Sequence, residues 1–171
     1  MNKIRPLQQQ DIEILGHLHF PWSTKDETIA KWRRYFEEQE RGLRISRIVE
    51  QQNKIIGYGN LLLHSEYPPF SKNQIPEISD LWVFEEYRKQ GIGSFLISHL
   101  ETEAKQQGCS QIGIGVGLYR DYGLAQKLYF QLGYLPDGEG ITYKYSPVTP
   151  GEKYPVDDDL ILWLVKPLRI A

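Results

Sequence analysis

The sequence predicts a mixed α/β fold in which helices cover the faces of a central sheet. A strand over residues 77–83 leads through a glycine-rich turn into residues 92–104, where apolar side chains recur at helical spacing. Residues 43–51 and 54–65 alternate in part between apolar and polar and are joined by two polar residues, which is typical of a β-hairpin. These two observations favour strands and helices in one domain over an all-helical or all-β fold.

The N-terminal part of the chain is expected to supply one strand and two helices. Residues 3–7 predict a short strand and residues 10–18 a short helix. A second helix follows, because Thr24 and Glu27 have the spacing of a capping box. Gly42 is expected to end this helix.

The C-terminal part is expected to alternate strands with one more helix. Residues 67–76 contain three prolines and predict a surface loop. In residues 111–116, isoleucine and valine alternate with glycine, so we expect a strand with one bare face. Asp121 is expected to cap a helix that ends at Gly133. The remaining elements are a strand over residues 134–145 interrupted by turn residues at 137–140, a loop over 146–159 and an apolar strand over 160–166.

The predicted order of elements is therefore β-α-α-β-β-β-α-β-α-β-β. The 171 residues show no internal repeat and no interior linker, so residues 1–171 are expected to form a single domain. The formal net charge of −2 gives no bulk attraction to nucleic acid or anionic membranes. No secretory signal is recognised, the longest apolar run is too short to span a bilayer, and the single Cys109 cannot form an internal disulfide. We expect a cytoplasmic protein.

The turn before the 92–104 helix has the properties of an anion site. A helix N-terminus offers unpaired backbone N–H groups and the positive end of the helix dipole. Gly91 and Gly93 allow a phosphate to approach the backbone, and Arg88 and Lys89 add positive charge. The pattern favours a pyrophosphate, and the alternative is a plain connection whose glycines serve the bend. Neither a dinucleotide fingerprint nor a P-loop is present.

Two motifs and the order of the elements carry a resemblance to a known family. The first motif is Arg-x-x-Gly-x-Gly at Arg88, Gly91 and Gly93. The second is Ala-x-x-Leu-Tyr-x-x-x-Gly-Tyr over residues 125–134. In this order they resemble the GCN5-related N-acetyltransferase (GNAT) superfamily, and the resemblance covers nearly the whole chain. It implies a mostly antiparallel central sheet with helices on both faces.

The resemblance also implies the reaction and the cosubstrate. It implies an enzyme that transfers an acetyl group from acetyl-CoA to a primary amine of a small molecule or peptide, by direct attack on the thioester. It implies a monomer or a homodimer. The strand that ends at Val83 resembles the one that pairs with the pantetheine arm, and the turn would hold the pyrophosphate. The cofactor-binding residues implied are Leu81, Trp82, Val83, Arg88, Lys89, Gln90, Gly91, Ile92, Gly93, Ser94 and Tyr122.

Two residues are candidates for catalysis. Tyr129 stands where the family places a tyrosine that donates a proton to the leaving thiolate, and its alternative role is a packed aromatic. Glu77 matches a position that some members use for a carboxylate base. Its even spacing from Val83 puts both side chains on one strand face, with Asp80 on the other. The alternative for Glu77 is an exposed carboxylate. Tyr122 departs from the asparagine that many members have at its position.

Other functions are alternatives to acetyl transfer. A non-catalytic CoA-binding sensor or interaction module would share the same fold and the same turn. A nucleotide-binding protein that uses residues 113–117 is disfavoured by the strand pattern there. His17 and His19 lack an apparent third ligand, so no metal site is predicted. Five aromatic residues are candidates for the wall of an acceptor pocket, and the alternative is that they belong to the core. They are Phe20, Trp22, Trp32, Tyr35 and Tyr67.

Overall fold

The computed structural model describes residues 1–18 and 20–169, and its contacts divide the chain into two compact units. The first unit contains Met1–Leu61 and Asp80–Leu96, and the second contains Leu62–Ser79 and Ile97–Ala171. Each unit is thus built from two separate stretches of chain. The expectation of a single domain over residues 1–171 stays a prediction.

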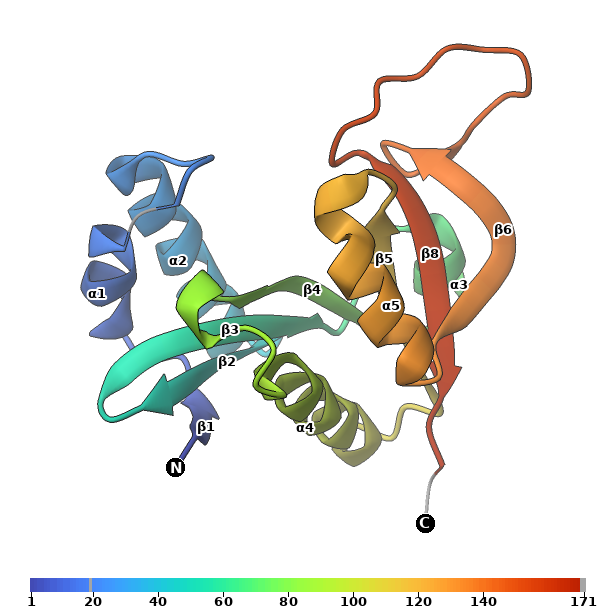
Figure 1. Cartoon of the computed structure of the whole chain (residues 1–171). Helices are drawn as coiled ribbons and strands as arrows, with labels where there is room; N and C mark the ends of the chain where they lie inside the picture. The colour runs from blue at the N-terminus through green and yellow to red at the C-terminus, as the bar shows by residue number, and fades with distance from the viewer. Residues whose placement is uncertain (19, 170–171) are drawn as a thin grey trace. The chain divides into compact units, whose positions relative to one another are not determined.

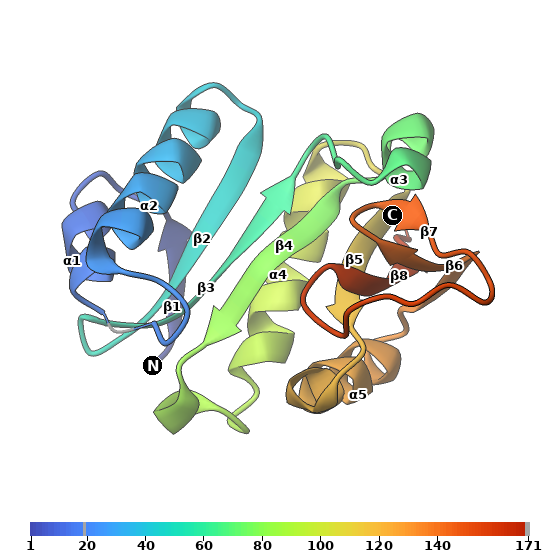
Figure 2. The same ribbon diagram turned by 90° about the horizontal axis from the view of Figure 1, so that it is seen from above.

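Eight strands form one mixed sheet (Figures 1 and 2). The strands are β1 (Lys3–Pro6), β2 (Arg44–Gln51), β3 (Lys54–Leu62), β4 (Glu77–Val83), β5 (Gln111–Gly117), β6 (Leu135–Tyr143), β7 (Ser146–Pro147) and β8 (Leu160–Pro167). Their order is β1-β2-β3-β4-β5-β8-β6-β7. The pairs β1–β2, β5–β8, β6–β8 and β6–β7 are antiparallel, whereas β4 and β5 run parallel. The predicted mixed, mostly antiparallel sheet is confirmed.

Five α-helices and two short 3-10 helices connect the strands within the described part of the chain. They are α1 (Asp11–His17), α2 (Lys25–Glu40), α3 (Pro68–Asn73), α4 (Ile92–Gln106), α5 (Gly123–Gln131), η1 (Glu85–Tyr87) and η2 (Arg120–Tyr122). Among these described helices, none is both long and apolar enough to cross a membrane. Compared with the predicted order, the structure adds α3, β7 and the two 3-10 helices.

The first unit is organised by the long helix α2. The helix begins with the predicted capping box, since Thr24 accepts from the backbone N–H of Glu27 and the Glu27 side chain accepts from that of Thr24. β2 and β3 are neighbours joined by Gln52 and Asn53, whose φ angles of 50° and 61° match a two-residue hairpin turn. The core of this unit consists of Leu7, Ile12, Leu15, Phe20, Trp32, Tyr35, Ile48 and Tyr58.

In the second unit, α3 and α5 lie on opposite faces of β5 and β8 (Figures 1 and 2). The bare face of β5 is filled by aromatic rings of the same chain. A Cβ added to Gly113 would stand 2.1 Å from the Phe70 ring, and one added to Gly117 would stand 2.4 Å from Tyr122. The strand predicted at residues 111–116 is confirmed, and its glycines leave room for protein side chains.

Two local predictions are wrong. Residues 67–76 do not form a surface loop, because they contain α3, and Tyr67 and Phe70 are 1% exposed. Two of the prolines stand in the first turn of α3, where the fixed φ suits a helix and no N–H partner is needed. Asp121 lies inside η2, and α5 begins after Tyr122 without a side-chain cap.

Candidate active site

The basic turn of the first unit has the geometry of an anion site. Residues 88–91 are exposed, and Lys89 and Gly91 have φ angles of 59° and 79°. The space around Gly91 is open, since an added Cβ would meet nothing within 4 Å. The N–H of Phe95 donates to the carbonyl of Gly91 at 3.0 Å, so the N–H groups of residues 92–94 precede the first bond of α4. The turn therefore fits a pyrophosphate group.

Arg88 connects this turn to the end of β4. Its Nε donates to the carbonyl oxygen of Val83 at 2.8 Å. Its guanidinium lies 4.5 Å from the centre of the Trp82 ring. These contacts hold the positive charge beside the turn and leave the terminal nitrogens of an exposed side chain available to an anion.

β4 is interrupted at its middle. Asp80 has a φ of 45°, in the left-handed region that non-glycine residues seldom adopt. Its carboxylate accepts hydrogen bonds from Lys31 Nζ at 3.0 Å and from the Tyr35 hydroxyl at 3.2 Å. A left-handed residue breaks the alternation of a strand, so the spacing argument that paired Glu77 with Val83 on one face does not hold.

Glu77 begins β4 as a buried acid of the second unit. Its side chain belongs to the buried polar set at 8% exposure. The Ser65 hydroxyl donates to a Glu77 carboxylate oxygen at 2.5 Å and accepts from the backbone N–H of Tyr67 at 3.1 Å. The alternative of an exposed carboxylate is therefore wrong. A buried carboxylate that accepts a hydrogen bond from a hydroxyl has an oxygen that can serve as a general base.

Tyr129 is buried on α5 at 7% exposure, beside the ring of Tyr134 at a centroid distance of 6.3 Å. Burial raises the pKa of its phenol to about 12. Within the described residues its hydroxyl makes no hydrogen bond. The side chain thus packs as an aromatic, and its hydroxyl stays protonated at neutral pH and free to donate a hydrogen bond.

The hydroxyl of Tyr122 is engaged within the second unit. It donates to Oδ1 of Asp158 at 2.9 Å, and the Tyr119 hydroxyl donates to the same oxygen. Burial and the hydrogen bond to Asp158 raise the pKa of Tyr122. Because the ring lies against Gly117, this side chain ties η2 to the segment before β8.

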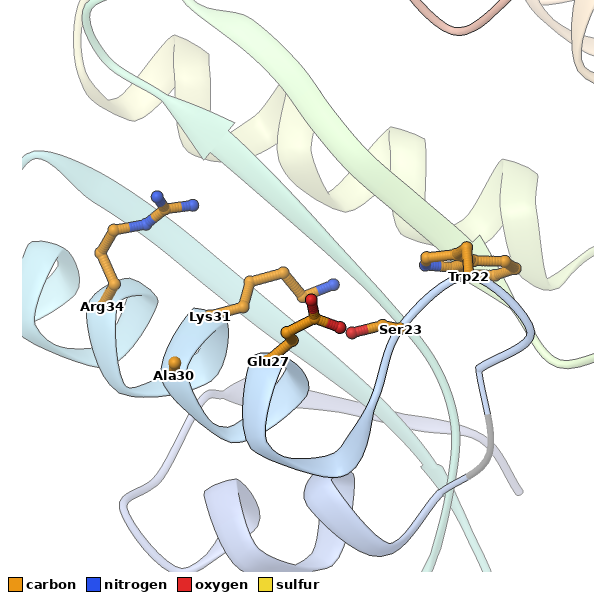
Figure 3. Close-up of a pocket in the computed structure, with 6 residues that line it drawn as sticks. All are labelled: Trp22, Ser23, Glu27, Ala30, Lys31 and Arg34. Atoms are coloured by element: carbon orange, nitrogen blue, oxygen red, sulfur yellow. The ribbon is translucent and has the colours of Figure 1, made fainter.

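Sequence reasoning did not find a pocket of about 630 Å³ in the first unit (Figure 3). Its lining residues are Trp22, Ser23, Glu27, Ala30, Lys31 and Arg34. The last four share one face of α2 at i, i+3, i+4 and i+7 spacing, and this periodicity was the available signal.

The predicted acceptor aromatics separate into two groups. Trp22 alone lines this pocket, and it is 56% exposed. Phe20, Trp32 and Tyr35 belong to the core of the first unit. Tyr67 is buried in the second unit, stacked on Trp163 at a centroid distance of 4.2 Å. His19 lies outside the described residues.

Comparison with known proteins defines the class. The family model of the Acetyltransferase (GNAT) family matches residues 5–134. The chain therefore belongs to this family of acetyltransferases, as its motifs predicted. Among curated proteins, none matches the chain.

Solved structures share the fold. The ribosomal-protein-S18-alanine N-acetyltransferase of Escherichia coli is 20% identical with a TM-score of 0.66, over 100% of this chain and 96% of that chain. An N-acetyltransferase of Staphylococcus aureus Mu50 is 20% identical with a TM-score of 0.69, over 99% of both chains. An aminoglycoside 6′-N-acetyltransferase in complex with coenzyme A is 17% identical with a TM-score of 0.68, over 98% of this chain and 97% of that chain.

Proposed function

We propose that this chain is an acetyl-CoA-dependent N-acetyltransferase that acts on a primary amine of a small molecule or peptide. The observation that carries the proposal is the exposed, open turn at the start of α4, with its basic side chains and its N–H groups. Membership of the GNAT family supports the same reaction. We further propose a cytoplasmic protein, monomeric or homodimeric.

Acetyl-CoA would be held by backbone groups more than by side chains. We assign the pyrophosphate to the backbone of residues 89–94, with Arg88 and Lys89 as charge partners. The chain at 81–83 would pair with the pantetheine arm, and the N–H near Val83 would polarise the thioester carbonyl. We propose that Tyr122 contacts the cofactor through its ring or backbone, because its hydroxyl is bound to Asp158.

The transfer forms a C–N bond and breaks a C–S bond, so a proton leaves the amine and the sulfur gains one. We propose that Glu77 takes the amine proton, directly or through water. We propose that Tyr129 donates to the leaving sulfur. A phenol of pKa about 12 and a thiol of pKa about 8.5 differ by about 3.5 units, or roughly 5 kcal/mol. Tyr129 would therefore stabilise the thiolate by a hydrogen bond. It would transfer its proton to the sulfur only if the phenol oxygen received another proton at the same time.

The first experiment is calorimetric titration with acetyl-CoA and, separately, with ATP and NAD. Micromolar binding of acetyl-CoA alone would support the proposal, and release of the CoA thiol with a panel of amines would complete it. Absence of acetyl-CoA binding would show that the turn is structural and would overturn the proposal.

A non-catalytic CoA-binding module is the second candidate. It is favoured by Tyr122, which stands at the position where many family members have an asparagine. The Tyr122 hydroxyl is bound to Asp158. Acetyl-CoA binding without transfer to any amine in the panel, and without hydrolysis, would favour the module. Transfer to one amine would exclude it.

A further inference from the structure

The pocket on α2 has an unusual balance of charge. Lys31 and Arg34 extend from α2 to the same side of the helix, and Trp22 lies across from them (Figure 3). Two positive side chains therefore line the pocket together with one carboxylate, Glu27. The partners of each charged group decide what the pocket attracts.

Arg34 has donors that are not in use. Its side chain is 65% exposed, and its Nε lies 3.8 Å from Oε1 of Glu38. The other oxygen of Glu38 is bound at 2.6 Å by Nε of the buried Arg44. Within the described residues, nothing accepts a hydrogen bond from Arg34. Its planar guanidinium is therefore available for a two-point contact with a carboxylate or phosphate.

Lys31 is held in place by the core. Its Nζ donates to Asp80 at 3.0 Å, and its side chain is 25% exposed. An ammonium has three donors, so one hydrogen bond leaves others available. Nζ also lies 5.2–5.8 Å from the centres of four rings, which belong to Phe20, Trp32, Tyr35 and Tyr58. A cation fixed in this way needs no further ordering to meet a ligand.

The carboxylate of the pocket is committed to the helix end. Oε2 of Glu27 accepts from the backbone N–H of Thr24 at 2.8 Å and from its hydroxyl at 2.9 Å. These hydrogen bonds lower the pKa of Glu27, so it stays ionised as part of the cap. The uncommitted groups of the pocket are therefore positive, and they favour an anion over a second ammonium.

The pocket also has an apolar wall that leads to β4. Trp22 is exposed to the pocket, and its ring lies 4.6 Å from that of Trp82 at an interplanar angle of 74°. Trp82 belongs to the segment that the proposed function assigns to the pantetheine arm. A ligand whose anionic end meets Arg34 and whose organic part covers Trp22 would lie beside that segment of the same unit.

We propose that this pocket binds an anionic group of the acceptor, so that the acceptor is a primary amine that also carries a carboxylate or a phosphate. The inference rests on the proposed function and names its substrate class. It gives Arg34 the role of a specificity-determining residue, assisted by Lys31.

The test compares amines with and without the anionic group, and each rate is expressed per unprotonated amine, because a nearby carboxylate or phosphate also changes the pKa of the amine. One arm compares leucine with leucinamide, and the other compares phosphoethanolamine with ethanolamine. A charge-assisted hydrogen bond of about 1.5–3 kcal/mol predicts that kcat/KM is about 10- to 100-fold higher for the anionic member. The arm that shows this difference identifies the carboxylate or the phosphate as the recognised group.

Arg34→Gln is the informative variant, because an exposed side chain can be changed without unfolding the protein. It should raise KM about 10-fold for the anionic amine and leave kcat and the neutral amine unchanged. Arg33→Gln is the matched control, since Arg33 is 63% exposed on the same helix, 4.0 Å from Glu13, outside the pocket lining. Equal kinetics of the two variants would overturn the inference.

A binding measurement separates this inference from the proposed function. Tryptophan fluorescence, read during titration with the anionic amines without acetyl-CoA, should report binding that Arg34→Gln weakens and Arg33→Gln does not. This result would support the pocket assignment even if no amine were acetylated. No preference for anionic over neutral amines in either arm, by rate and by fluorescence, would overturn the inference and leave acetyl transfer intact.

Discussion

The hydroxyl of Ser65 donates a hydrogen bond of 2.5 Å to the carboxylate of Glu77 at the beginning of β4. The same hydroxyl accepts from the backbone N–H of Tyr67, so the position of the acid is fixed by the chain that leads into α3. A base that is already oriented needs less reorganisation when the amine arrives. The contact thus gives a physical reason to test Glu77 before any other carboxylate.

Glu77→Gln keeps the size of the side chain and an acceptor for Ser65, but removes the basic oxygen. If Glu77 takes the amine proton, kcat should fall about 10²- to 10⁴-fold, while the dissociation constant of acetyl-CoA stays the same. Stopped assays of thiol release and calorimetry measure the two quantities. Glu66→Gln is the control, because Glu66 is exposed and directly follows Ser65 in the chain. Wild-type turnover in Glu77→Gln would remove Glu77 from the mechanism.

Tyr129→Phe removes a hydroxyl that makes no hydrogen bond within the described residues. The ring remains to fill its buried site, so the fold and the affinity for acetyl-CoA should be retained. Acetyl transfer should slow by about 10²-fold if the hydroxyl donates to the leaving sulfur. Steady-state kinetics with one amine measure the effect. Unchanged turnover would leave Tyr129 with a packing role alone.

The wild-type protein and Tyr129→Phe should also differ in stability at alkaline pH. The pKa of Tyr129 is raised from 10.0 to about 12, so the folded state favours the protonated phenol. The stability that this gives is fully present below pH 10 and is lost as the pH rises through about 12. Two pKa units correspond to roughly 2.7 kcal/mol. The free energy of unfolding, measured with urea, should therefore fall less between these pH values for Tyr129→Phe than for the wild type. An equal fall in both proteins would contradict the burial argument.

The turn before α4 predicts a loss of cofactor affinity. Arg88→Ala removes a charge beside the turn and should weaken acetyl-CoA binding about 10-fold or more, since a hydrogen bond to a charged group contributes about 1.5–3 kcal/mol. Gly91→Glu should have a larger effect, because it adds a negative charge at a φ of 79°. Gly91→Ala separates backbone strain from charge, and calorimetry measures all three. Wild-type affinity in Arg88→Ala and Gly91→Glu would show that the turn is structural.

The sequence predicted most of the strands, the capping box and the turn because each depends on residues close together in the chain, whereas the mostly antiparallel sheet followed from the family resemblance. Thr24 and Glu27 interact across three positions, and the glycine-rich turn is a continuous stretch of chain. Helix α3 was missed because Pro68 and Pro69 suit both a loop and a first helical turn. The segment forms a helix that buries Phe70 against β5. Because β5 comes much later in the chain, the local sequence does not reveal this contact.

The candidate site likewise contains residues that a local motif identified and residues whose environment depends on distant parts of the chain. The motif identified Arg88 and Gly91, whereas the environment of Glu77 depends on Ser65, which no local pattern connects to it. The strand alternation used for Glu77 failed at Asp80, whose left-handed backbone is held by partners on α2. The engaged hydroxyl of Tyr122 depends on Asp158, which lies 36 residues later in the chain.

The bare face of β5 gives a prediction about stability alone. A methyl group added to Gly113 would stand 2.1 Å from the ring of Phe70, so Gly113→Ala forces the ring to move and should destabilise the protein by about 1–3 kcal/mol. Gly123→Ala is the matched control, because Gly123 begins α5 with a helical φ of −56° and open space around it. It should be neutral or stabilise by up to about 1 kcal/mol.

Urea midpoints of both variants measure this difference. Phe70→Leu combined with Gly113→Ala should recover part of the loss, since a smaller side chain leaves room for the methyl group. That recovery would assign the glycines of β5 to aromatic packing. If Gly113→Ala were as stable as Gly123→Ala, the face of β5 would not need its glycines for packing, and approach by a ligand would become the better explanation.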